Sequence, residues 1–198
     1  MDPEQMIRGI ASFAGLLFLL FIIATAFISR LGPASLEERG AKFWLSLPVM
    51  LVQTAFFVII GLVLWHPIPL GPDEEQRRIL LGAGALPYFG GLALYLWGLW
   101  VLGRGFGASS VFGVRLRTQP RLVTSGPFRF LRHPLYAGLI LASFGGMLIF
   151  LTWSMVAAAV FAPALVLRAR REERVLARQF GDEWARYASV TPAWLPRF

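Results

Sequence analysis

Long apolar runs alternate with short polar segments along this chain, and each run is long enough to approach or cross a bilayer as a helix. The runs cover residues 9–29, 43–65 and 79–102, and a further uncharged stretch covers 134–167. Two full spans need about 40 residues plus a turn. The last stretch has only 34 residues, so we expect a tight hairpin that turns at 152–154. The pattern predicts an all-α fold, a multi-span transmembrane helical bundle of about five spans, followed by a helical tail.

Local signals refine these elements. Pro87 and the Gly90-Gly91 pair predict a kink or a close helix contact in the third span. In the tail, an amphipathic helix is expected to run to Phe180 and to stop at Gly181, a natural position for a residue that ends a helix. A short helix is then expected over 182–187.

The Lys and Arg residues are distributed unevenly between the two ends of the predicted spans. Five spans with the N-terminus outside place 16 of them on one side and 3 on the other. The positive-inside rule makes the richer side cytoplasmic, so the tail and the catalytic face are predicted to be cytoplasmic. The net charge is +8, and anionic lipid headgroups or an anionic substrate suit it better than nucleic acid, because no nucleic-acid motif accompanies it.

The composition excludes a water-soluble globular protein. Charged residues make up 15% of the chain and hydrophobic residues 57%, whereas a soluble domain has about 25% charged residues. The chain has no cysteine, and its two histidines, His66 and His133, lie far apart. We therefore expect no metal centre. His66 is interpreted as a loop residue, and the sequence leaves the oligomeric state open.

A glycine-rich segment at 103–107 matches the GxGxG pattern of dinucleotide sites. It follows a predicted transmembrane helix rather than a strand, so the context that would support a nucleotide loop is missing. We interpret it as a helix-terminating segment.

The residues Arg132-His133-Pro-Leu-Tyr136 stand at the mouth of the apolar hairpin. A cation, an imidazole and a phenol at a membrane boundary are typical of a functional site. An interfacial anchor, with Arg132 reaching to the headgroups and Tyr136 in the aromatic belt, explains the same pattern. The motif alone leaves both interpretations open.

Arg168 and Glu172 share one face of a helix at the other end of the hairpin. A surface ion pair of this kind contributes only a few tenths of a kcal/mol. Its position opposite His133 favours a functional role. Glu172 could accept from an ammonium group, His133 and Tyr136 could donate, and Arg168 could hold an anion, as a small zwitterionic cofactor requires. Backbone groups near residues 122–123 could bind a purine edge.

These motifs resemble a known family. Leu-Val-Thr-Ser-Gly-Pro-Phe from residue 122, Arg-His-Pro-Leu-Tyr from 132, Arg-Ala-Arg-Arg-Glu-Glu from 168 and Phe-Gly-Asp-Glu-Trp from 180 are similar to motifs of the integral membrane methyltransferases. This family includes isoprenylcysteine carboxyl methyltransferase and the phospholipid N-methyltransferases. The resemblance covers about residues 103–198 and divides the chain into three scaffold spans, 1–102, and a cofactor-binding catalytic half with the hairpin 134–167 and the tail.

The resemblance implies a cofactor, S-adenosyl-L-methionine, and a set of site residues. The cofactor-binding positions map onto Leu122, Val123, Phe128, His133, Pro134, Leu135, Tyr136 and Glu172, and the substrate-side arginine onto Arg168. Three positions depart from the pattern: Phe128 and Trp184 replace tyrosines, and Pro120 stands where some members have histidine. Phe128 loses a hydroxyl but keeps a stacking surface.

The resemblance therefore implies methyl transfer to a lipophilic acceptor that enters from the bilayer, such as an isoprenylcysteine-type carboxylate or a related lipid. A phosphatidylethanolamine amine and a small lipophilic thiol fit the same residues. A non-catalytic membrane protein that retains the fold is a further alternative. A lipid reductase would need phosphate recognition for its nicotinamide cofactor, which the sequence does not reveal.

Overall fold

The structure, a computed structural model, describes residues 3–28, 47–102 and 122–194, and its regular elements in these ranges are all helical. The elements before the hairpin are α1 (Pro3–Ile28), α2 (Leu47–Val63), α3 (Glu74–Leu102) and the short 3-10 helix η2 (Gly126–Arg129). They are followed by α5 (Pro134–Phe150), α6 (Trp153–Phe161), the 3-10 turn η3 (Ala162–Ala164), α7 (Leu165–Phe180) and α8 (Asp182–Val190). The predicted all-α class is confirmed. The glycine-rich segment 103–107 and Pro120 lie outside the described residues.

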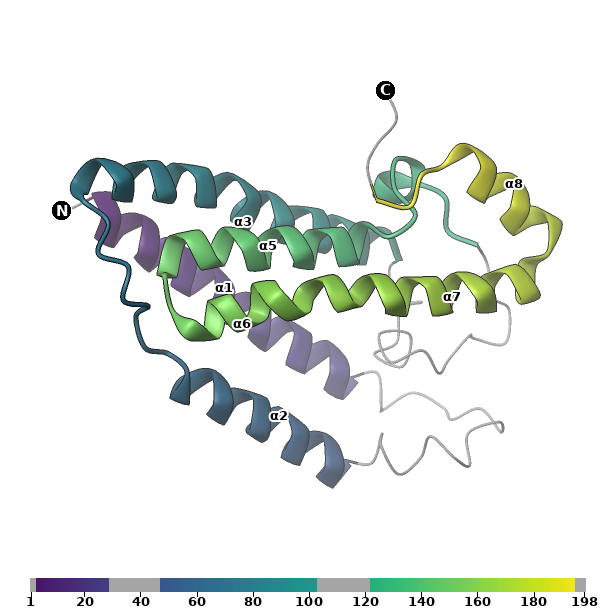
Figure 1. Cartoon of the computed structure of the whole chain (residues 1–198). Coiled ribbons are helices and arrows are strands. Elements are labelled where there is room, and N and C mark those ends of the chain that lie inside the picture. Colours follow the sequence, from purple (N-terminus) through teal and green to yellow (C-terminus); the bar gives the residue numbers. More distant parts are fainter. Residues whose placement is uncertain (1–2, 29–46, 103–121, 195–198) are drawn as a thin grey trace.

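Helices α3 and α5 lie side by side and antiparallel at the centre of the bundle (Figure 1). Helix α1 packs against both of them, and α6, η3 and α7 form the return leg of the hairpin. We call the end that carries residues 132–136 and 168–173 the polar end. The opposite end, where α5 turns into α6 at 151–152, is called the turn end. The first residues of α1 lie at the turn end, so the start of α1 and the polar end are at opposite ends of the bundle.

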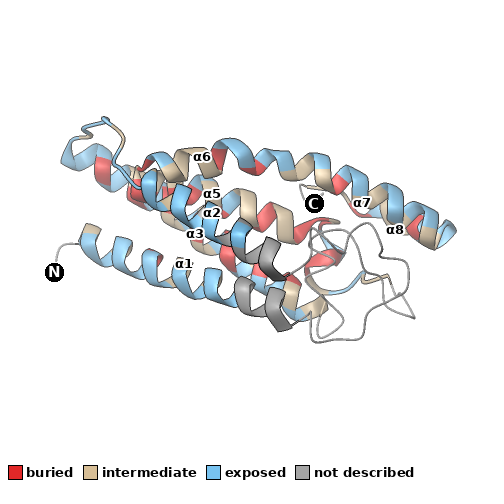
Figure 2. Cartoon of the chain, turned by 90° about the horizontal axis from the view of Figure 1, so that it is seen from below, coloured by how far each residue is buried: buried red, intermediate tan, exposed pale blue. Residues whose placement is uncertain are grey.

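The outer faces of the helices are exposed (Figure 2). Many of their exposed side chains are large and apolar, as lipid contact requires. Examples are Phe13, Leu86 and Trp100, which are 63%, 82% and 80% exposed. Among the described residues, α1, α3 and the α6–α7 leg are each long and apolar enough to cross a membrane, and α5 is a shorter apolar helix. The chain therefore forms a helical membrane bundle.

Glycines bring α3 and α5 into backbone contact. A Cβ atom built on Gly84 would lie 2.8 Å from the carbonyl oxygen of Gly145, and one on Gly138 would lie 2.6 Å from that of Gly91. Small residues at helix interfaces let backbones approach closely in a bilayer, where packing drives association. The close contact predicted around Gly91 is confirmed, whereas Gly90 faces open space.

Helix α3 begins at Glu74, before the predicted apolar span 79–102, because a capping box starts the helix earlier. The backbone N–H of Gln76 donates to Asp73 Oδ1 at 2.8 Å, and the N–H of Asp73 donates to Gln76 Oε1 at 3.3 Å. These bonds satisfy N–H groups that the first turn of a helix leaves without intrahelical partners. The helix therefore starts at Glu74, outside the apolar run, and carries Arg77 into the bundle.

Arg77 is a cation buried at the turn end, with 9% of its surface exposed. Its Nη2 donates to the carbonyl of Ile149 at 2.6 Å and its Nη1 to that of Leu148 at 3.2 Å, while Nε donates to Glu4 Oε1 at 2.8 Å. It thus neutralises the negative end of the α5 dipole and joins α1 to α5 through α3.

The predicted hairpin is confirmed, but its reversal comes slightly earlier than expected. The chain turns at Leu151, whose φ of 49° is left-handed, while Trp153 already begins α6. The preceding loop supports the turn: the N–H of Ile68 donates to the Leu151 carbonyl at 2.8 Å, and that of Trp153 donates to the His66 carbonyl at 3.0 Å. The backbone of His66 therefore braces the hairpin.

The tail follows the predicted order of elements. Helix α7 ends at Phe180, and Gly181 has a φ of 48°, as predicted for a residue that ends a helix. Helix α8 then runs to Val190, beyond the predicted end at residue 187. It turns the tail back over η2 and the start of α5 at the polar end.

Candidate functional site

The polar end gathers the site because two antiparallel helices meet there. His133 immediately precedes α5, and Pro134 occupies the first helical position, where its missing N–H removes no helical hydrogen bond. Tyr136 lies in the first turn of α5. Helix α7 returns past this point and presents Arg168 and Glu172 on its half-buried face.

Tyr136 joins the two charged residues of α7. Arg168 Nε donates to the Tyr136 hydroxyl at 2.7 Å and to Glu172 Oε1 at 3.2 Å, and the Tyr136 hydroxyl donates to the same carboxylate oxygen. The side chains of Arg168 and Glu172 are 30% and 28% exposed. The pair is thus tied to a phenol on another helix, which an isolated surface ion pair would not be.

A second cluster is centred on Glu173. Its Oε1 accepts from Arg132 Nε and from His133 Nε2, each at 2.9 Å. His133 is buried, with 6% of its surface exposed, and the Arg132 side chain is largely buried. Neighbouring carboxylates on α7 therefore serve two different clusters, with Glu172 bonded to Tyr136.

Arg132 also holds the end of α8. Its Nη1 donates to the carbonyl of Ala188 at 2.8 Å and to that of Thr191 at 3.3 Å. Its guanidinium lies over the buried Trp184 ring, 5.9 Å from the ring centroid. A cation bonded to the last carbonyls of a helix is favourable for both the hydrogen bonds and the dipole. Arg132 thus fastens α8 to the start of α5.

The segment after α8 covers His133. The backbone N–H of Arg132 donates to the Pro192 carbonyl at 2.9 Å, and that of His133 donates to the Ala193 carbonyl at 3.3 Å. The Trp194 ring stacks on the imidazole, with centroids 5.3 Å apart and an interplanar angle of 28°. The imidazole is therefore enclosed by the tail and oriented by Glu173.

Tyr187 connects α8 to η2. Its hydroxyl donates to the Phe128 carbonyl at 2.7 Å. Burial raises the pKa of Tyr187 to about 12, an effect that the nearby Arg132 guanidinium opposes and Glu173 reinforces. The Phe128 ring, which stands where the resembling family has tyrosine, is itself buried.

The predicted site residues therefore fall into two groups. His133, Tyr136, Arg168 and Glu172 gather at the polar end, in the two clusters described above. The others lie around them: Leu122 and Val123 are half-buried ahead of η2, Phe128 lies in η2, and Pro134 and Leu135 belong to the first turn of α5. The last two face α3, where Leu135 Cδ1 would be 2.6 Å from a Cβ built on Gly98.

Sequence reasoning considered Arg132 only as part of the polar motif or as an interfacial anchor, and it assigned no role to Glu173. A signal for their pairing was present in the sequence: two adjacent acids, Glu172-Glu173, follow the predicted hairpin, and two adjacent basic residues, Arg132-His133, precede it. Side chains of adjacent helical residues diverge, so two neighbouring acids meet different partners. Among the residues that the structure describes, no group of three or more His, Cys, Asp or Glu side chains could hold a metal ion.

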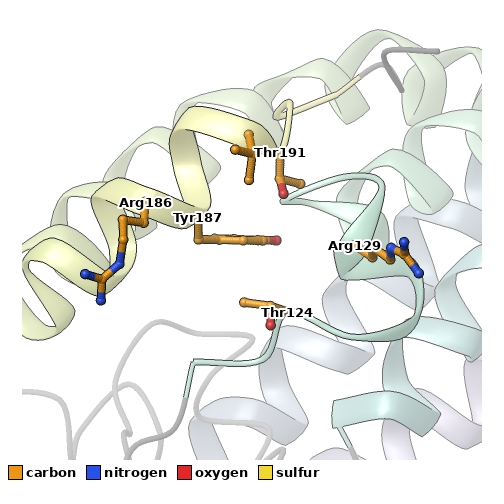
Figure 3. A pocket seen from close by; sticks show the side chains of 6 residues that line it. Thr124, Arg129, Arg186, Tyr187 and Thr191 are labelled. Carbon is orange, nitrogen blue, oxygen red and sulfur yellow. The ribbon is translucent and has the colours of Figure 1, made fainter.

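An open cavity of about 510 Å³ lies beside these clusters (Figure 3). It is lined by Thr124, Arg129, Arg186, Tyr187, Val190 and Thr191. Its volume falls in the range of small-molecule sites, about 300–1,000 Å³. None of the predicted site residues lines it. Its wall contacts one of them through the hydrogen bond from Tyr187 to the Phe128 carbonyl, and it contacts the Glu173 cluster through Thr191 and Arg132.

Comparison with known proteins finds two similar relatives that carry names from metal resistance. The chain is 44% identical over 85 residues to the cobalt-zinc-cadmium resistance protein CzcN of Cupriavidus metallidurans. It is 38% identical over 88 residues to the nickel-cobalt-cadmium resistance protein NccN of Alcaligenes xylosoxydans xylosoxydans. Each match covers 41% of this chain and 38% of the relative, so the chain matches well under half the length of either.

A family model matches a larger part of the chain. The model of the phospholipid methyltransferase family covers residues 79–183, from α3 through the hairpin and α7 to the start of α8. This range contains both clusters of the polar end. Because the match extends over more than half of the sequence, the chain belongs to the phospholipid methyltransferase family, the membrane methyltransferases that include the isoprenylcysteine carboxyl methyltransferases.

Proposed function

We propose that this protein is an S-adenosylmethionine-dependent methyltransferase of the membrane that acts on a lipophilic acceptor of the isoprenylcysteine-carboxylate type or a related lipid. The observation that carries the proposal is the contact of Tyr136 with both Arg168 and Glu172 at the polar end of an apolar bundle. The contact brings together one cation and one anion whose side chains are 30% and 28% exposed, which supports a role in binding a charged ligand.

The donor set fits the proposed cofactor. S-adenosylmethionine carries an ammonium and a carboxylate on its amino-acid part, and a carboxylate such as Glu172 is the natural acceptor for the ammonium. The Glu172 Oε1 atom already accepts from Arg168 and Tyr136, so it is oriented as an acceptor.

Each residue has a proposed part in the reaction. The cofactor, when bound, supplies an electrophilic methyl group on a sulfonium. Glu172 would hold its ammonium, while His133, fixed by Glu173 and covered by Trp194, would provide a rigid wall. Arg168 would position an anionic acceptor, since its attraction for a carboxylate strengthens where water is scarce. Orientation of the two reactants is the main contribution that such a transfer needs.

Isothermal titration with S-adenosylhomocysteine tests the cofactor assignment. We expect Glu172→Gln to weaken binding, because it removes a charge-assisted contact of roughly 1.5–3 kcal/mol, or about 10- to 150-fold in Kd. Glu183→Gln, an exposed acid on α8, serves as the matched control and should bind like the wild type. Failure of the wild type to bind would favour the non-catalytic alternative.

The acceptor is tested by transfer of labelled methyl groups to three candidates in parallel. These are a farnesylated cysteine derivative, phosphatidylethanolamine and a small lipophilic thiol. We expect the carboxylate to be preferred and Arg168→Gln to lower its turnover. Labelling of the amine or the thiol instead would reject the carboxylate assignment while leaving the methyltransferase assignment in place.

A further inference from the structure

Helix α7 separates its charges by face. The side chains of Arg168, Glu172 and Glu173 point toward the bundle and are half-buried. The outward face carries four exposed arginines and no acid: Arg170, Arg171, Arg174 and Arg178. We call these four residues the arginine face.

The arginine face is costly without an external anion. Arg170 and Arg174 are four residues apart, as are Arg174 and Arg178, and like charges at this spacing destabilise a helix by a few tenths of a kcal/mol per pair. No ion pair within the described ranges involves any of the four. Within the part of the chain that the structure describes, no acid therefore pairs with these arginines.

The arginine face continues the lipid-facing surface of the bundle. Along the same return leg, Val160, Phe161 and Leu167 are 67%, 72% and 59% exposed, and Arg170 follows directly. The exposed surface thus changes from apolar to cationic within one helical turn. Such a change is typical of a helix that passes from the hydrocarbon into the headgroup layer.

We infer that the arginine face binds the headgroups of anionic phospholipids in the leaflet at the polar end. The phosphates of these lipids would relieve the repulsion between the arginines. They would also bind the outward face of α7, while Tyr136, Arg132 and His133 bind its inward face. The inference depends on the membrane bundle and on the charge pattern, and it does not require methyl transfer.

Native mass spectrometry of the full chain in a neutral detergent, titrated with phosphatidylglycerol, tests the inference. We expect Arg170→Gln/Arg174→Gln to raise the Kd of bound phosphatidylglycerol, on the order of fivefold for each arginine removed. Binding of phosphatidylcholine should not change. The substitutions are exposed and remove like-charge pairs, so the thermal midpoint in the neutral detergent should be equal or higher.

The matched control is Arg129→Gln/Arg186→Gln, which removes the same charge from exposed residues elsewhere at the polar end. We expect it to leave the phosphatidylglycerol affinity within about twofold of the wild type. An equal loss in both double variants would assign the effect to net charge and overturn the inference. Complete displacement of the lipid by an equal concentration of inorganic phosphate would also overturn it, because a soluble anion would then suffice.

Discussion

The imidazole of His133, immediately before α5, and the carboxylate of Glu173 on α7 are joined by a hydrogen bond of 2.9 Å. The same carboxylate oxygen accepts from Arg132. We expect Glu173→Ala to lower the free energy of unfolding by about 3 kcal/mol, because it leaves a largely buried guanidinium without its anion. Chemical unfolding in detergent measures this loss, with Glu183→Ala as the exposed control. Equal stabilities of the two variants would contradict a stabilising role for the bonds of Glu173 with Arg132 and His133.

Tyr187 makes the docking of α8 sensitive to alkaline pH. Its pKa is raised by burial from 10.0 to about 12, so its contribution to stability is complete below pH 10 and is lost as the pH rises through 12. Tyr187→Phe should cost about 1 kcal/mol at neutral pH, since the Phe128 carbonyl loses its donor. The difference in thermal midpoint between wild type and variant should shrink between these pH values. A difference independent of pH would refute the assignment.

The glycine contacts predict that alanine substitutions at Gly90 and Gly91 change the stability of the protein in opposite directions. A Cβ on Gly91 would lie 2.6 Å from the backbone nitrogen of Ala142, which cannot move cheaply. We expect Gly91→Ala to cost about 1–3 kcal/mol through overpacking. Gly90→Ala meets open space and should stabilise α3 by about 0.5–1 kcal/mol. Thermal unfolding of both variants in one detergent decides between these signs, and the same sign for both would be inconsistent with the contact.

Arg77 and Arg78 offer a second pair of neighbours with different surroundings. Arg77→Gln removes charge-assisted bonds to the Ile149 and Leu148 carbonyls and should cost about 1.5–3 kcal/mol. The Arg78 side chain is 79% exposed and its ion pair among the described residues is with Glu74 at 3.4 Å, so Arg78→Gln should have little effect. Urea unfolding measures the loss of stability in the two variants. A loss in Arg78→Gln as large as in Arg77→Gln would argue against stabilisation of the α5 end by Arg77.

The orientation of the protein remains a prediction from charge. With 16 of the Lys and Arg residues on the polar-end side of the predicted spans, we expect the C-terminal side to be cytoplasmic. A reporter that is active only in the cytoplasm, fused after Phe198, should therefore be active. An expressed but silent fusion, together with an active fusion before Met1, would reverse the orientation.

Hydrophobic pattern and glycine placement predicted the helical class, the hairpin and the contact at Gly91, because these depend on residue type along one segment. The roles of Arg132 and Glu173 could not be derived in this way. Arg132 bonds to the carbonyls of Ala188 and Thr191. Because every residue has a backbone carbonyl, the sequence does not indicate which carbonyls will accept these bonds. Arg77 lies outside the predicted span 79–102. The capping-box pattern of Asp73 and Gln76 is local, but the burial of Arg77 depends on the distant carbonyls of Leu148 and Ile149.

Pro134 and Leu135 illustrate a further limit. Family motifs place them near a cofactor, but a motif does not tell which helix a side chain will meet. In the structure Leu135 packs against Gly98 of α3, while the neighbouring Tyr136 points to α7. The spacing of a helix separates adjacent residues by about 100°, so only the arrangement of all three helices determines these directions.

The way in which Arg132 is satisfied has a consequence for biosynthesis. Its partners, Glu173, Ala188 and Thr191, come 41, 56 and 59 residues later in the chain. During translation, Arg132 is therefore made before any of the groups that compensate its charge. Arg132 and His133 must wait at the membrane surface in contact with water or lipid phosphates. The polar end can mature only after the last helix has emerged, which makes its assembly a late event in the life of the nascent chain.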